Sequence, residues 1–149
     1  MDVLDLLKQD HRTVRKLLEE ACDTTEHASK TRRELLQRIV EELEVHTAAE
    51  ETILYPYLIR AEDRDTRHEG LEATEEHHLV QVVLDEIQQL DVEEEQWLAK
   101  ATVLRELVEH HVEEEEEEMF DTIRELFDVQ RRQELGEEVR RFKKDRQAA

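Results

Sequence analysis

Six residues of the kinds that bind transition metals occur where a helical protein is expected to place apolar side chains. Each expected helix carries a stripe of Leu, Ile, Val and Ala at spacings of three and four, and a histidine interrupts that stripe. In two of the helices a glutamate follows the histidine four residues later. The interrupting residues are His11, His46, Glu50, His77, His111 and Glu115.

The spacing of the two His–Glu pairs indicates what these residues do. Residues four positions apart share one face of a helix, so both members of each pair point into the core. Buried carboxylates without partners are strongly unfavourable, and two of them beside four imidazoles require positive charge. Two divalent or trivalent metal ions would supply that charge. Mixed imidazole and carboxylate ligation suits iron, manganese or zinc better than copper or calcium.

Other polar residues near these stripes are expected to lie outside the site. His78 and His110 would belong to half-polar or acidic stripes, and His27 and His68 fall at helix ends or in loops, where we expect surface positions. Two acidic residues each directly precede a candidate ligand histidine and could either support it or carry surface charge. We favour surface charge for this pair, Asp10 and Glu76.

Helices must position these residues, and the composition favours them. The chain has 149 residues, 42% of them charged, with two glycines, one proline and no asparagine. Turns between strands depend on such residues, whereas the abundant Glu, Leu, Arg, Ala and Val suit long helices. We predict an all-α protein with helices at about 2–26, 31–61, 70–90 and 93–128. Their short connections, including the charged stretch 61–70, predict an up-down-up-down four-helix bundle.

Three features refine this arrangement. His11 and His46 lie at similar distances from the turn between their helices and should sit at one depth, whereas the match is looser for the later helices. Pro56 must kink the second helix or tighten its last turn. The basic tail is expected to form a short helix docked on the acidic bundle, or otherwise to bind a partner. The predicted division is therefore a bundle at 1–128 and a helical extension at 129–149.

The charge balance limits the partners. With 41 acidic and 21 basic residues the formal net charge is −20, which disfavours nucleic acids and anionic membranes. The single cysteine, the acidic N-terminus and the lack of a 20-residue apolar run predict a cytoplasmic protein without a signal peptide. A monomer or weak homodimer is expected, and the choice between them stays open because Tyr55, Trp97 and Phe127 could face either a core or a partner.

At these residues the chain resembles the hemerythrin-like HHE cation-binding domains. The shared features are QDH, HTAAEETILYP, EEHHLV and HHVEEEEEEMF, and each H-x-x-x-E-E pattern is followed by an aromatic residue, Tyr55 or Phe120. The resemblance covers residues 1 to about 128. It implies that the six residues hold two non-haem iron ions with carboxylate and oxo bridges, Glu50 and Glu115 being the bridging carboxylates. Manganese or zinc could substitute for iron.

The chain departs from the oxygen-carrier hemerythrins at two points. Those proteins have a second histidine one turn from the ligand of the third helix, where this chain has Ala73 and Gln81. They also use H-x-x-x-x-D in the fourth helix, where this chain has H-x-x-x-E, and Asp121 stands where the second helix has Pro56. One ligand fewer leaves a more open coordination sphere, which argues against simple reversible oxygen transport.

Three functions remain open from the sequence. The first is a di-iron protein that binds or reacts with O2, NO or peroxide, for sensing, storage or detoxification. The second is a di-iron enzyme that disproportionates peroxide or oxidises ferrous iron or NO. The third is a metal-free acidic helical interaction protein, whose melting temperature a chelator would leave unchanged.

Overall fold

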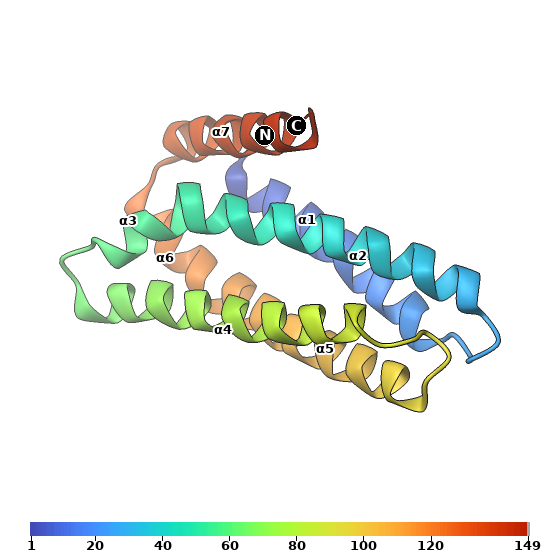
Figure 1. Ribbon diagram of the computed structural model, residues 1–149. Coiled ribbons are helices and arrows are strands. Elements are labelled where there is room, and N and C mark those ends of the chain that lie inside the picture. Colours follow the sequence, from blue (N-terminus) through green and yellow to red (C-terminus); the bar gives the residue numbers. More distant parts are fainter. Residues whose placement is uncertain (149) are drawn as a thin grey trace.

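The computed structural model describes residues 1–148, and these residues are all-helical, with no strand among them (Figure 1). This confirms the all-α prediction. No helix in this part of the chain is both long and apolar enough to cross a bilayer. The elements are α1 (Val3–Cys22), α2 (Ser29–Ala49), η1 (Glu50–Leu54), α3 (Tyr55–Ile59), α4 (Arg64–Gln88), α5 (Glu95–Glu114), η2 (Glu115–Met119), α6 (Phe120–Leu126) and α7 (Val129–Ala148).

Two of the long helices contain one turn of π-helix. The chain passes from α2 through η1 into α3 without a break, and from α5 through η2 into α6 in the same way. In these wide turns the Tyr55 N–H donates to the Glu50 carbonyl, and the Phe120 N–H donates to the Glu115 carbonyl. Pro56 follows η1 directly. Because η2 forms without a proline, Pro56 is not the shared cause of the two π turns.

The third long helix begins earlier than predicted. The stretch 61–70, expected to be a connection, is mostly the first part of α4, and only residues 60–63 link α3 to α4. Asp63 caps the new start, since its Oδ2 accepts from the Thr66 N–H at 3.0 Å. A Cβ on Gly70 would lie 3.0 Å from the Leu58 Cβ. The glycine therefore permits close packing of α4 on α3 and does not end a helix.

Two apolar clusters lie among helices α1, α2, α4 and α5. Helix α1 packs on α2 and α5, and α4 packs on α5 and α3, contacts that the predicted up-down-up-down bundle requires (Figure 1). One cluster contains Leu18, Leu84 and Trp97, and the other contains Leu7 and Phe120. Along each long helix the candidate metal ligands lie between residues of these two clusters. The polar site therefore occupies the middle of the core.

Helix α7 docks on α1, α2 and η1, as expected for a basic segment on an acidic bundle (Figure 1). Leu135 and Val139 are buried in the second cluster. Arg132 Nε donates to Asp2 Oδ2 at 2.9 Å, and Lys143 Nζ contacts Asp10. Ala149, the last residue of the predicted tail, lies outside the described residues, and the division of the chain at residue 128 stays a prediction.

Candidate metal centre

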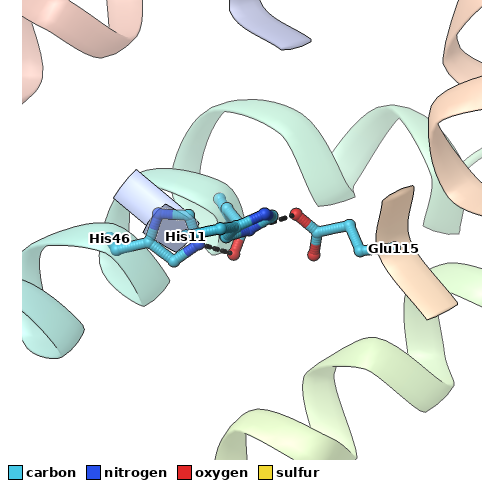
Figure 2. A group of neighbouring side chains, drawn as sticks. His11, His46 and Glu115 are labelled. Carbon is cyan, nitrogen blue, oxygen red and sulfur yellow. Dashed lines mark ion pairs between the residues drawn. The ribbon is translucent and has the colours of Figure 1, made fainter. Parts of the chain in front are cut away.

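The helices bring all six predicted residues together in the middle of the core. None of the six is more than 6% exposed. Figure 2 shows the His11 ring directed at the carboxylate of Glu115, with His46 on its other side; His11 Nε2 lies 3.3 Å from Glu115 Oε1. His27, His68, His78 and His110 are exposed or lie near the surface, as predicted.

The six residues form two overlapping groups of four. In each group, one possible ligand atom from every residue lies within 4.8 Å of the others. Glu50 and Glu115 belong to both groups. One group adds the histidines of α1 and α2, and the other adds those of α4 and α5. The groups are His11, His46, Glu50 and Glu115, and Glu50, His77, His111 and Glu115.

A carboxylate faces the Nδ1 atom of every one of these histidines. For His46 and His111 that carboxylate belongs to the residue preceding another ligand, Asp10 or Glu76, which corrects the surface-charge interpretation of these two. The other two histidines use the residue that follows a shared glutamate. The Nδ1–oxygen distances are 2.8 Å for His11–Glu116, 2.8 Å for His46–Asp10, 2.9 Å for His111–Glu76 and 3.6 Å for His77–Glu51.

For His11, His46 and His111, the hydrogen bond to a carboxylate assigns a proton to Nδ1 and turns Nε2 towards the centre. His77 Nδ1 has no hydrogen-bond partner among the described residues, although its Nε2 also faces the centre. The Nε2 atoms of His77 and His111 lie only 3.1 Å apart. Several inward atoms have no hydrogen-bond partner among the described residues, including His11 Nε2, His46 Nε2 and both carboxylate oxygens of Glu50. Lone pairs converging at such distances repel one another unless a proton or a cation lies between them. The donor set therefore fits metal ions.

The pKa values show the same need for positive charge. Burial alone would lower the pKa of His46, but the charge of Glu50 and the hydrogen bond to Asp10 outweigh burial and raise this pKa to about 10. Burial would raise the pKa of Glu115, but contacts with neighbouring site residues, Glu50 first among them, hold it well below its ordinary value. An ionised Glu115 carboxylate this deep in the core requires compensating positive charge, from protons on the histidines or from metal ions.

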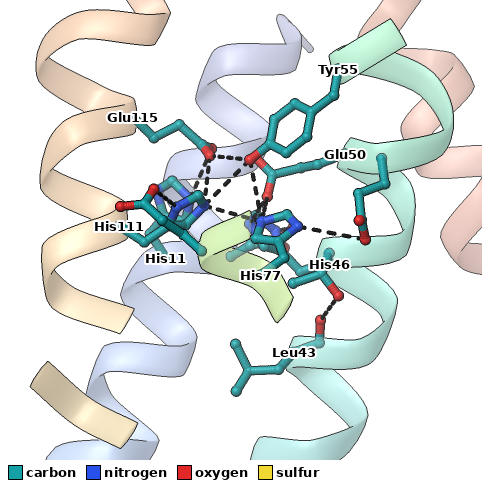
Figure 3. A network of polar contacts seen from close by, with 12 residues as sticks. His11, Leu43, His46, Glu50, Tyr55, His77, His111 and Glu115 are labelled. Atoms are coloured by element: carbon teal, nitrogen blue, oxygen red, sulfur yellow. Dashed lines mark hydrogen bonds and ion pairs between the residues drawn. The ribbon is translucent and has the colours of Figure 1, made fainter. Parts of the chain in front are cut away.

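Tyr55 is a site residue that the sequence did not identify. Its hydroxyl donates to Glu115 Oε2 at 2.7 Å and lies 3.2 Å from His77 Nε2 and 3.3 Å from His111 Nε2. Burial, reinforced by the charge of Glu115, raises its pKa well above 10, so the phenol is neutral. In Figure 3 Tyr55 and the two shared glutamates lie on one side of the histidine rings. Phe120, at the equivalent place after η2, stacks on His11 with ring centroids 6.2 Å apart.

A small apolar cavity lies against the other side of the histidine rings, where Figure 3 places Leu43. Its volume is about 20 Å³. A cavity needs roughly 10–15 Å³ to hold one water molecule, so this one has room for a single small molecule. Its apolar lining favours an uncharged guest over an ion. Apart from the four histidines, Asp10 and Thr47, the lining is Val14, Leu43, Val80, Val108 and Val112.

These features define an all-helical protein whose core holds histidine and carboxylate groups able to bind metal ions. The sequence model of the hemerythrin HHE cation binding domain matches residues 2–123, and the chain belongs to this family. The resemblance inferred from the motifs is thereby confirmed. Proteins of this family bind metal ions, and the buried His/Glu groups are able to hold them. Neither the curated proteins nor the solved structures gave a significant match.

Proposed function

We propose that the protein is a non-haem di-iron protein that binds or reacts with O2, NO or peroxide. The observation that carries the proposal is the pair of four-residue groups that share Glu50 and Glu115. Each group offers two neutral nitrogen ligands, and the shared carboxylates supply negative charge to both. Two adjacent cations bridged by carboxylates match this pattern. Manganese and zinc accept the same ligands, so they are the possible substitutes.

The residues divide between the two ions in a simple way. His11 and His46 would hold one ion, His77 and His111 would hold the other, and the two glutamates would contact both. Iron bound here would supply the redox chemistry. The carboxylates on the Nδ1 atoms fix the orientation of the rings and make the imidazoles better ligands. Each of these carboxylates belongs to a residue directly before or directly after a candidate ligand in the sequence.

Two further features support a small, uncharged ligand. The apolar cavity beside the rings has space for a diatomic molecule and offers almost no polar surface to water. On the glutamate side, Tyr55 holds its proton at the hydroxyl oxygen, because its pKa lies well above neutrality. The centre therefore has a dry space for a guest on one side of the rings and, on the other side, a neutral hydroxyl that donates to Glu115. The dry space suits a site that takes up O2, NO or peroxide.

Metal analysis combined with ultraviolet–visible spectra tests the proposal. The metal-free protein is loaded with ferrous iron under anaerobic conditions, desalted, and measured in air and after dithionite. We expect two irons per chain and an absorption that changes on reduction. Metal that binds only the folded state stabilises it by about 4 kcal/mol when free metal exceeds Kd by about a thousandfold, so a chelator should lower the melting temperature. Absence of bound metal, with no effect of chelator, would favour a metal-free interaction protein.

A further inference from the structure

A second group of metal-ligating side chains lies between α4 and α5, beside the centre. It consists of Glu76, His110 and Glu114, and one possible ligand atom of each lies within 4.8 Å of the others. His110 Nε2 lies 3.0 Å from Glu114 Oε1 and 3.5 Å from Glu76 Oε2. Unlike the six core residues, this group is accessible, since the His110 side chain is 63% exposed. We call it the outer group.

Glu76 connects the outer group to the centre. While its Oε2 faces His110, its Oε1 accepts from His111 Nδ1 at 2.9 Å. One carboxylate therefore contacts an exposed imidazole and a candidate ligand of the centre at once. A cation held by the outer group would lie one side chain away from the buried site.

A cavity follows the same path from the surface inward. It has a volume of about 110 Å³ and lies between α4 and the α5–η2 segment. At its inner end is Glu115, which is only 1% exposed. Its Oε1 has no hydrogen-bond partner among the described residues and faces the centre, 3.3 Å from His11 Nε2. Acidic residues thus make up most of the cavity lining. Its lining is His68, Glu69, Glu72, Ala73, Glu76, His111, Glu114, Glu115, Glu118 and Met119.

The other sides of the centre are less favourable to a cation. Basic helix α7 lies across the α1–α2 side, where Lys143 contacts Asp10 (Figure 1). A groove between α2 and α4 reaches His77, but only two glutamates, Glu51 and Glu75, line it. Six glutamates line the cavity between α4 and α5. The charge distribution therefore directs a cation to the α4–α5 side.

We infer that the cavity between α4 and α5 is the route by which metal ions reach the centre, with the outer group as a transient binding site for a divalent cation. The inference rests on the proposed function, because it needs a centre that takes up metal. Oxygen ligands from Glu76 and Glu114 with the imidazole of His110 suit Fe²⁺ and similar ions. A cation bound by the outer group would exchange readily because this group is open to solvent.

Stopped-flow uptake of Co²⁺ by the metal-free full-length protein tests this route, since Co²⁺ bound by imidazole and carboxylate absorbs in the visible. The test variant is His110→Gln with Glu114→Gln. The control is His78→Gln with Glu75→Gln, which removes the same side-chain types and the same charge from the α2–α4 groove. At low salt we expect the test variant to load about tenfold more slowly, the lower end of what electrostatic steering achieves. The control should load at the wild-type rate, and both should reach the wild-type endpoint.

Rate and endpoint separate the two ideas. Equal rates in wild type and test variant, or slowing confined to the control, would overturn the route while the centre itself stands. Failure of the wild-type protein to bind two Co²⁺ per chain would overturn the proposed function, and the route with it. Slowing of the test variant that disappears at high salt would support the route, because salt screens exposed charges.

Discussion

The segments 46–55 and 111–120 share one arrangement of site residues and end in different aromatic residues. Each begins with a ligand histidine, places a shared glutamate four residues later, and then widens into a π turn, η1 or η2. Each ends with a fully buried aromatic residue five positions after the glutamate, Tyr55 in the first and Phe120 in the second. The backbone is therefore alike in the two halves of the centre, and the aromatic side chain that ends each segment differs.

The consequence is that the two ligand groups have unequal surroundings. Tyr55 comes from the first segment but reaches across to His77, His111 and Glu115. Phe120 comes from the second segment and stacks on His11. One position therefore has a hydroxyl group beside it, and the other has only a phenyl ring. The surroundings differ as well, because α7 covers the first pair of helices and the acidic cavity opens beside the second pair.

The largest expected effect comes from the glutamates that the two halves share. Because Glu50 and Glu115 each belong to both ligand groups, Glu50→Ala and Glu115→Ala should each abolish tight binding at both positions. Each variant should then lose the metal-linked stability, about 4 kcal/mol at a thousandfold excess of metal over Kd. Metal content after desalting and thermal melts with added iron measure this, with exposed Glu113→Ala as control. A variant that kept two ions would show that its glutamate is not shared.

Histidine variants should affect one position each. His11→Ala removes a ligand from the first group only, and His77→Ala removes one from the second only. We expect each variant to retain about one tightly bound ion per chain, because the other group keeps its ligands. Metal analysis alongside the exposed His78→Ala control measures this. Loss of both ions in either variant would mean that the two groups bind metal only together. The two halves of the centre would then not be independent.

The clustering of the six buried residues could be predicted from the sequence because they replace apolar residues on helical stripes, and a regular helix fixes which residues share a face. Tyr55 could not be placed by that rule. In a regular α-helix, a residue five positions after Glu50 is rotated by about 140° from it. The π turn removes most of that rotation and brings the phenol over the carboxylate, and only the folded backbone reveals the turn.

Two other errors also arose from packing. Asp10 and Glu76 sit at the edge of the buried stripe, where sequence alone does not decide between solvent and a neighbouring helix. The histidines that they contact lie on other helices, which no local pattern predicts. Gly70 ends the charged stretch 61–70, which the sequence predicts to be a connection but which is mostly helix α4. Here its missing side chain is what lets α4 approach α3.

The smallest expected effect comes from exchanging the two aromatic residues. Tyr55→Phe leaves Glu115 Oε2 without its donor, and a buried acceptor that loses its partner costs about 1–2 kcal/mol. Phe120→Tyr adds a hydroxyl at a position with no exposure, so it should cost a similar amount for the opposite reason, a polar group buried without a built partner. Urea denaturation of the metal-free proteins measures both free energies of unfolding. If the hydroxyl acts only as a local donor to Glu115, the double variant should show the sum of the two losses. A double variant as stable as the wild type would mean that the new hydroxyl beside His11 donates to the carboxylates as effectively as the Tyr55 hydroxyl does. The two halves of the centre would then be interchangeable.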